Sequence, residues 1–139
     1  MEIQNRKARF NYFIEKTYEA GIVLTGTEIK SIRNGSANFN DAYIRIKDGE
    51  AYVVNMYIAK YEDGSIYNHE ERRLRKLLMH KTEIRRLGNE IHTGGYTLVP
   101  VKLYFKEGLA KISVGLAKGK KLYDKRETIK KRDLDRSLR

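Results

Sequence analysis

The amino-acid sequence predicts a mainly β fold with short helices: an OB-like closed β-barrel with about three peripheral helices and a disordered basic C-terminal tail. Apolar and polar residues alternate with a period of two over several stretches, which is typical of strands with one buried face. Two pairs of these stretches are joined by a two-residue Asp-Gly or Glu-Gly turn, and helical patterns are few and short. Because a curled sheet removes long exposed edges, a barrel is favoured over a mixed α+β sandwich, the second choice.

The chain begins with a short helix, a long strand and a second helix. Arg6 to Phe10 is a helical segment with Asn5 at the position of its N-cap. Tyr12 to Leu24 is an extended segment. Thr25-Gly26-Thr27-Glu28 has the spacing of a capping box, and the helix that it opens should end at Asn34-Gly35.

A first hairpin follows this helix. Phe39 to Lys47 alternates, with Ile44 and Ile46 on one face and charged or polar residues on the other. Asp48-Gly49 supplies the residue types that a tight hairpin turn requires. Glu50 to Ala59 then returns as a strand rich in Tyr and Val.

A third helix separates the two hairpins. Lys81 to His92 carries Ile84, Leu87 and Ile91 at helical spacing, so one face of the segment is apolar. Gly94-Gly95 directly after it predicts the helix end.

The second hairpin runs out over Tyr96 to Lys106, turns at Glu107-Gly108 and returns over Leu109 to Ala117. Pro100 interrupts the first of these strands. Because proline lacks a backbone donor, we expect it at a strand edge or a bulge.

The chain is strongly basic and contains no cysteine. Its 139 residues include 29 Lys+Arg and 18 Asp+Glu, a formal net charge of +11. This surplus indicates a polyanionic partner, because each cation that displaces a condensed counterion adds salt-dependent affinity. The lack of cysteine excludes disulfides and thiolate metal sites and suits a reducing cytoplasm. With no apolar run of membrane-spanning length and no signal core, we expect a cytoplasmic protein without a membrane partner.

Composition divides the chain into two parts. Residues 1–123 form the predicted OB-like RNA-binding barrel domain, and residues 124–139 a flexible basic tail, in which 11 of 16 residues are charged. Such a tail has too little apolar surface to fold alone in water. Its composition still suits a helix formed against a large RNA surface. A merely solubilising terminus is an equally open interpretation.

Catalytic patterns are weak. The three histidines, His69, His80 and His92, lack metal-ligand spacing, and Glu70-Glu71 beside Arg72-Arg73 is typical of a solvated charge run. No carboxylate cluster of the kind that holds catalytic metal ions stands out. We therefore expect no enzyme, no metal and no cofactor. A metal-assisted nuclease remains the alternative from the enzyme class.

Nucleic-acid binding is better supported. Ten Tyr and four Phe interleave with Lys and Arg, as in the run from Arg9 to Phe13. Aromatic faces can stack on unpaired bases while cations hold phosphates. Most aromatics on alternating strands are nonetheless core residues. The cations crowded between residues 69 and 86, and those between Ala117 and Arg126, are stronger evidence. A generic OB-type single-strand binder or a ribosomal protein fits these features too.

Specific strings of the sequence resemble the small protein B family, the bacterial tmRNA-binding (SsrA-binding) proteins. The likeness is collinear from about Asn5 to Arg132. The strings that carry it are Asn5-Arg6-Lys7-Ala8-Arg9, Tyr12-Phe13-Ile14-Glu15, Tyr18-Glu19-Ala20-Gly21-Ile22, Gly26-Thr27-Glu28-Ile29-Lys30-Ser31, Asp41-Ala42-Tyr43, Arg75-Lys76-Leu77-Leu78-Met79-His80, Gly95-Tyr96-Thr97-Leu98-Val99-Pro100, Ala117-Lys118-Gly119-Lys120-Lys121 and Asp124-Lys125-Arg126.

The resemblance implies an OB-type barrel with flanking helices in a non-catalytic cytoplasmic adaptor. Such a protein binds the tRNA-like domain of tmRNA (SsrA RNA) and delivers it to stalled ribosomes for trans-translation, ribosome rescue and peptide tagging. The implied partners are tmRNA, the ribosome at its decoding centre and mRNA channel, and elongation factor Tu with GTP, indirectly through charged tmRNA. The tail would become helical on the ribosome.

The resemblance also implies residue roles. Glu19, Leu78, His80 and Lys111 match tmRNA-binding positions, Asn5 lies at a neighbouring match, and Lys118, Lys120 and Lys121 match the segment joining barrel to tail. An intramolecular ion pair is an equally good interpretation of Glu19, and Leu78 could belong to the core. The implied ribosome-binding residues of the tail are Tyr123, Asp124, Lys125, Arg126, Lys130, Lys131, Arg132 and Arg136.

Overall fold

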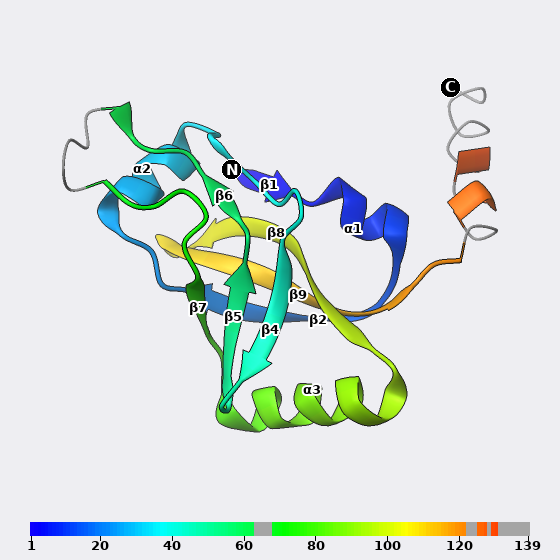
Figure 1. The fold of residues 1–139 in the computed structure, drawn as a ribbon. Coiled ribbons are helices and arrows are strands. Elements are labelled where there is room, and N and C mark those ends of the chain that lie inside the picture. Colours follow the sequence, from blue (N-terminus) through cyan, green and yellow to red (C-terminus); the bar gives the residue numbers. More distant parts are fainter. Residues whose placement is uncertain (63–67, 122–124, 128, 131–139) are drawn as a thin grey trace.

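The fold is a strongly curved antiparallel sheet with helices at its two ends (Figure 1). The structure is a computed structural model, and it describes residues 1–62, 68–121, 125–127 and 129–130. The strand order of the main sheet is β1-β8-β9-β2-β7-β5-β4. Its strands are β1 (Glu2–Gln4), β2 (Tyr12–Ile22), β4 (Tyr43–Lys47), β5 (Glu50–Val54), β7 (Arg75–Leu78), β8 (Thr97–Lys106) and β9 (Leu109–Gly119). A separate two-stranded sheet pairs β3 (Ala37–Asn38) with β6 (Tyr57–Ile58), and the helices are α1 (Arg6–Asn11), α2 (Gly26–Arg33) and α3 (Lys81–Gly94).

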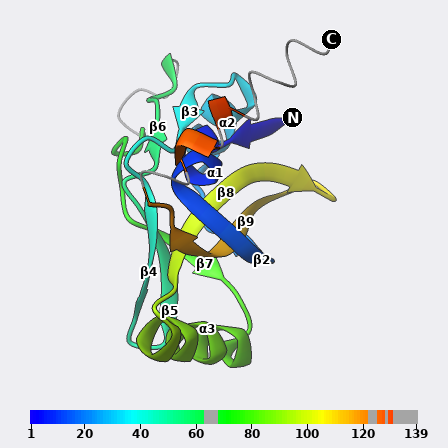
Figure 2. The same cartoon turned by 90° about the vertical axis from the view of Figure 1, so that its right-hand side faces the viewer.

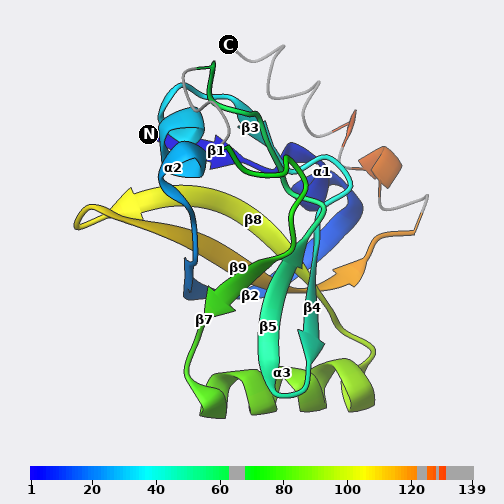
Figure 3. The ribbon, with the colours of Figure 1, turned by 60° about the vertical axis from the view of Figure 1, so that its left-hand side comes forward.

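The mainly β prediction is confirmed, whereas closure into an OB-like barrel is not. The sheet bends until β4 and β5 run across β2, β8 and β9 (Figure 2, Figure 3). In the described part of the chain no hydrogen-bonded ladder joins the edge strands β1 and β4. β4 approaches β8, but β1 already pairs with β8 over Lys102–Tyr104, and the Asn5 N–H donates to the Val101 carbonyl at 2.9 Å. The remaining gap is lined by Ile44, Leu98 and Ile91 of α3.

Both predicted hairpin turns are present and explain the register of the sheet. Asp48 and Gly49 have φ of 52° and 75°, and Glu107 and Gly108 have φ of 53° and 78°. Two successive positive φ values are the requirement of the type I′ turn, whose twist matches that of the flanking strands. The first hairpin is shorter than predicted, because left-handed residues stop it at both ends: Asp41 before β4 and Asn55 after β5.

The helix ends follow the predicted capping signals. Thr25 caps α2, the Glu28 N–H donates to its hydroxyl, and the Glu28 carboxylate accepts in return from the Thr25 N–H at 2.9 Å. Asn5 caps α1, and its side-chain oxygen accepts from the Ala8 N–H. α3 ends at Gly95, which is left-handed with φ of 69°. These local interactions satisfy backbone donors that would otherwise lack partners.

Two apolar clusters hold the sheet. The larger lies on its concave side and includes Val53, Leu77, Leu103 and Ile112, all fully buried. The smaller lies on the opposite side, where Ala8 and the rest of α1 cover Val99, Val101 and Ala117. Gly115 allows this second contact, since a Cβ there would lie 2.9 Å from Cγ2 of Val101.

The sequence patterns missed β7. Burial alternates along Arg75–Leu78, but the residue types Arg-Lys-Leu-Leu do not, because one of the two inward positions is Arg75, whose side chain is fully buried. The crowded cations of residues 69–86 are therefore only partly a surface feature. Arg75 is paired with the equally buried Glu28, so one of the cations assigned to a polyanion is neutralised inside the protein.

Candidate nucleic-acid interface

One exposed face of the sheet carries three of the predicted tmRNA-binding residues, Glu19, Leu78 and Lys111. Ala20, Leu77 and Ile112 point into the main core, so their neighbours along β2, β7 and β9 point to the other side. We call this the outer face, and it comprises Glu19, Gly21, Glu50, Tyr52, Lys76, Leu78, Lys102, Tyr104, Lys106 and Lys111.

Register brings three strands into one row at its centre. Gly21 of β2 lies opposite Leu78 of β7 on one side and opposite Lys111 of β9 on the other. A Cβ on Gly21 would lie 3.3 Å from the Leu78 Cβ, so the glycine leaves room between the two side chains. Leu78 is 56% exposed, which excludes the interpretation that it belongs to the core.

A shallow open cavity of about 510 Å³ lies over this row. Its lining includes Glu19, Leu78, His80 and Lys111, four residues that the sequence comparison with the family grouped together. His80 is exposed at the N-cap of α3, where its N–H donates to the Glu83 carboxylate at 3.4 Å. The cavity thus presents a carboxylate, an ammonium, an imidazole and an exposed apolar side chain within one lining.

Glu19 is already engaged within the protein. Its Oε2 accepts from the Tyr104 hydroxyl at 2.7 Å and from Lys106 at 3.5 Å, and its Oε1 lies 4.0 Å from the Lys111 ammonium. The Tyr104 hydrogen bond, outweighing a smaller opposite effect of burial, lowers the pKa of Glu19, and the two lysines add to the lowering. The ion-pair interpretation of Glu19 is confirmed, and the carboxylate is charged at neutral pH.

Asn5 lies apart from this cavity. Its amide donates to the Pro100 carbonyl at 2.7 Å while its side-chain oxygen caps α1. It lines a second cavity of about 310 Å³ with Lys7, Asp41 and Tyr43. The structure therefore does not bring Asn5 together with Glu19, and it gives the Asn5 side chain a structural task.

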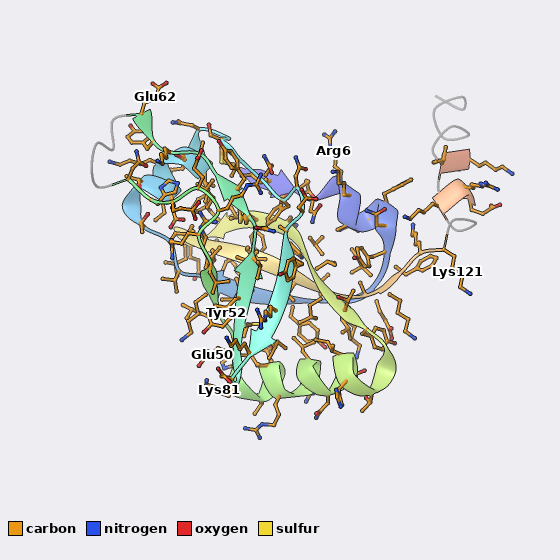
Figure 4. All side chains as sticks on the ribbon, viewed as in Figure 1. Arg6, Glu50, Tyr52, Glu62, Lys81 and Lys121 are labelled. Carbon is orange, nitrogen blue, oxygen red and sulfur yellow. The ribbon has the colours of Figure 1, made fainter. Side chains whose placement is uncertain are left out.

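The predicted lysines near the end of β9 form a third group. The Lys118 ammonium lies 4.6 Å from the centre of the Tyr96 ring, and the Lys120 ammonium lies 5.0 Å from that of Phe13. Phe13 is 53% exposed and sits opposite Lys118 in the β2–β9 ladder. Cations over exposed aromatic rings fit a surface for phosphates and bases. Figure 4 shows Lys121 on the side of the molecule away from Glu50 and Lys81.

Few of the predicted tail residues are described. Residues 125–127 and 129–130 are helical, where the sequence predicted an unordered segment, and Lys125 lies 6.0 Å from the centre of the Phe10 ring. These residues suit a helix because Lys, Arg, Glu and Ile tolerate it. Tyr123, Asp124, Lys131, Arg132 and Arg136 lie outside the described residues.

Sequence reasoning missed Tyr104 and the cations that accompany it. Lys102, Tyr104 and Lys106 alternate along β8 with buried Val101 and Leu103, so strand periodicity could have placed them on the outer face. It could not have paired them with Glu19, which lies two strands away. Lys76 and Lys81 both pair with Glu50, the contact with Lys76 being 3.4 Å. Figure 4 shows Lys81 beside Glu50.

The outer face is cationic but substantially compensated. Glu2 pairs with Lys102. Glu19 pairs with Lys106 and Lys111, and Glu50 pairs with Lys76 and Lys81. Within the described ranges, no group of three or more His, Asp or Glu side chains could hold a metal ion. Nor does any helix there combine the length and apolar character needed to cross a membrane.

A curved sheet on a basic chain, with exposed lysines, aromatic rings and a polar cavity on its outer face, defines a small β protein that binds a polyanion. The family model described as "SmpB protein" matches residues 2–139, and the chain belongs to this family.

Similar proteins and a solved structure support the same family. An "SsrA-binding protein" of Shouchella clausii is 57% identical over 97% of this chain and 86% of its own. One of Desulforudis audaxviator is 55% identical over 97% and 88%. A solved structure described as "tmRNA-SmpB: a journey to the center of the bacterial ribosome" is similar with a TM-score of 0.72 and 53% identity, over 87% of this chain and 85% of the other.

Proposed function

We propose that this chain is a non-catalytic adaptor that binds the tRNA-like domain of tmRNA and delivers it to stalled ribosomes for trans-translation and rescue. Membership of the SmpB family and similarity to SsrA-binding proteins over 97% of this chain support tmRNA as the RNA. Similarity to a structure of tmRNA and SmpB in the ribosome supports the ribosome as the place of action. Elongation factor Tu with GTP, acting through charged tmRNA, and a cytoplasmic location complete the proposal.

The observation that carries the proposal is the cavity on the outer face. Four residues line it together: Glu19 from one sequence string, Leu78 and His80 from a second, and Lys111 from β9. We assign Glu19, Leu78, His80 and Lys111 to contact with tmRNA, Lys111 through phosphate and the others through exposed base or ribose groups. Asn5 contributes by fixing α1 against β8.

The second surface involves the end of β9 and the tail. We assign Lys118, Lys120 and Lys121 to RNA phosphates near the point where the chain leaves the sheet. The tail residues Tyr123, Asp124, Lys125, Arg126, Lys130, Lys131, Arg132 and Arg136 are proposed to contact the ribosome at the decoding centre and mRNA channel.

The proposal is tested by binding to the transcribed tRNA-like domain at several salt concentrations. Lys111→Glu and Lys120→Glu should each weaken binding by about tenfold and reduce the dependence of affinity on salt, because each removes a phosphate partner. Lys60→Glu is the matched control, since Lys60 is an exposed lysine outside both surfaces. Equal affinity of all four proteins would show that the assigned lysines do not bind the RNA.

Competition separates this function from the alternatives. A generic single-strand binder would be displaced as readily by an unstructured oligonucleotide as by the folded tRNA-like domain, whereas the adaptor should prefer the folded RNA. A nuclease would cleave the RNA catalytically in the presence of Mg²⁺. Specific cleavage by a substoichiometric amount of protein would replace the adaptor proposal by the enzymatic one.

A further inference from the structure

Tyr104 is placed to control the orientation of Glu19. It lies on β8 opposite Lys111 of β9, and its hydroxyl reaches across to the Glu19 Oε2 on β2 at 2.7 Å. The contact therefore spans three strands of the outer face. It is the shortest hydrogen bond that Glu19 makes in the described part of the chain.

The ring of Tyr104 is itself held in place. It is partly buried, it lies opposite Glu2 of β1, and the Lys102 ammonium sits 5.2 Å from its centre. Burial and the hydrogen bond to Glu19 raise the pKa of Tyr104 to about 12. The hydroxyl consequently keeps its proton and remains a hydrogen-bond donor throughout the neutral range.

The two oxygens of Glu19 are thereby given different surroundings. Oε2 accepts from Tyr104 and Lys106, whereas the described residues place no donor closer to Oε1 than the Lys111 ammonium at 4.0 Å. That distance exceeds hydrogen-bond length, so Oε1 retains its capacity to accept. Oε1 and the Lys111 ammonium belong to residues that line the same cavity.

We propose that Tyr104 is a positioning residue for RNA binding: it holds Glu19 by Oε2 so that Oε1 accepts from an RNA amino group or ribose hydroxyl. Held in this way, Glu19 stays 4.0 Å from the Lys111 ammonium, within ion-pair range but without a hydrogen bond, so the ammonium can still donate to a phosphate. The inference rests on the proposed function, because it assigns Tyr104 a task in the same site. It also explains why an acidic side chain lies at the centre of a surface for a polyanion.

Removal of the hydroxyl alone tests the inference. Tyr104→Phe keeps the ring under Lys102 and should weaken binding of the transcribed tRNA-like domain by about fivefold to tenfold, the loss of one hydrogen bond to a charged group. Tyr61→Phe is the matched control. Tyr61 lies outside both proposed RNA-binding surfaces, the Lys30 ammonium sits 5.3 Å from the centre of its ring, and the described residues show no hydrogen bond of its hydroxyl. A urea melt of each variant shows that the fold is retained.

A double-mutant cycle distinguishes positioning from a merely structural effect. In a Glu19→Ala background, Tyr104→Phe should have no further effect on affinity, because the group that it positions is gone. If the ring had only a structural role, Tyr104→Phe would bind the RNA with unchanged affinity, and only Tyr104→Ala would bind it more weakly.

The titration of the Glu19 carboxyl provides a readout that needs no RNA. The groups that contact Glu19 are Tyr104 and Lys106 from β8 and Lys111 from β9. The other titratable residues that line the same cavity are Glu50 of β5, Lys76 of β7, and His80, Lys81 and Glu83 at the start of α3. In Tyr104→Phe, the pKa of Glu19 measured by carboxyl-carbon NMR should rise, because its main hydrogen bond is lost. In Tyr61→Phe the pKa of Glu19 should stay unchanged.

The outcomes separate the two proposals. If wild type retains the RNA and Tyr104→Phe binds equally well, the inference is wrong and the proposed function stands. The inference is also wrong if Tyr104→Phe lowers the affinity for RNA as much in the Glu19→Ala background as in the wild type. If wild type does not retain the tRNA-like domain, the proposed function fails and the role of Tyr104 in it fails as well, whatever the titration of Glu19 shows.

Discussion

The carboxylate of Glu28 on α2 and the guanidinium of Arg75 on β7 are both fully buried and bind each other. The other Glu28 oxygen accepts from Arg73 at 2.5 Å. Arg75 also donates to the Met56 carbonyl at 2.6 Å and the Glu71 carbonyl at 3.1 Å. This network fixes β7 to α2, and the last residue of β7 is Leu78, which lines the outer-face cavity.

We predict that Glu28→Ala strongly destabilises the protein. The change leaves Arg75 charged and buried without its carboxylate, and such losses reach about 3–5 kcal/mol. Urea unfolding measures it. Glu50→Ala is the control, because Glu50 pairs with the exposed Lys76 and Lys81, and exposed pairs contribute little. Similar midpoints for the two variants would contradict a structural role for the buried pair.

The same pair predicts a dependence of stability on acid. Burial raises the pKa of Glu28, but hydrogen bonds from Arg73, the Thr25 N–H and Arg75 outweigh it, so the pKa lies below its ordinary value of 4.5. A carboxyl with a lowered folded-state pKa contributes its full stability above its unfolded pKa and loses it as the pH falls through the folded one. The stability difference between wild type and Glu28→Gln should therefore be constant above about pH 5 and shrink in more acid solution. Urea unfolding at a series of pH values checks this, and a difference that grows toward acid would contradict it.

Local signals predicted the parts of the fold that local energetics determine. Asp48-Gly49 and Thr25 with Glu28 act over a few residues, so their types alone specify a turn and a cap. Arg75 could not be placed in this way, because its burial depends on Glu28, far away in the chain. The prediction of a closed barrel failed for a similar reason. β1 pairs with β8, and no sequence pattern near residues 2–4 predicts that pairing.

The candidate site shows the same division. The family resemblance supplied Glu19, Leu78, His80 and Lys111, but only the register of β7, β2 and β9 shows that they share a cavity. The resemblance grouped Asn5 with them, but in the structure Asn5 lies elsewhere. Its side-chain amide donates to the Pro100 carbonyl, and its side-chain oxygen caps α1. Tyr104 belongs to no recognisable motif, and its role depends on a contact between β8 and β2, with β9 between them.

Gly115 should tolerate no side chain. A Cβ would lie 2.9 Å from the Val101 Cγ2 and 3.2 Å from the Ile14 Cγ2, in the small cluster under α1. We predict that Gly115→Ala destabilises the protein by about 1–3 kcal/mol, as overpacked cores do. Gly88→Ala within α3 meets no atom within 4 Å and should be neutral or stabilising by up to about 1 kcal/mol. Thermal unfolding compares the two, and equal melting temperatures would show that the cluster adapts without loss.

Gly21 should matter for binding more than for stability. An added Cβ would lie 3.3 Å from the Leu78 Cβ, which requires the two strands to separate by only a few tenths of an ångström, and the rest of the exposed Leu78 side chain can turn into solvent. Gly21→Ala should therefore unfold at nearly the wild-type urea concentration but bind the tRNA-like domain more weakly, because it fills the centre of the cavity. Gly26→Ala, with no atom within 4 Å of the new Cβ, is the control for both measurements. Unchanged affinity would remove the Gly21–Leu78 row from the interface.

Deletion of residues 124–139 should separate RNA binding from tagging. The outer face lies on the sheet, so the shortened protein should bind the tRNA-like domain with nearly unchanged affinity and yet fail to support tagging on stalled ribosomes. In the free protein, circular dichroism should lose little helical signal on deletion, because a segment of this length with few apolar residues barely holds a helix alone. Although residues 125–127 and 129–130 are helical in the structure, the Lys125–Phe10 ring contact is long at 6.0 Å. A large loss of ellipticity would show that the tail is folded before it meets the ribosome, and retained tagging would remove the tail from the mechanism.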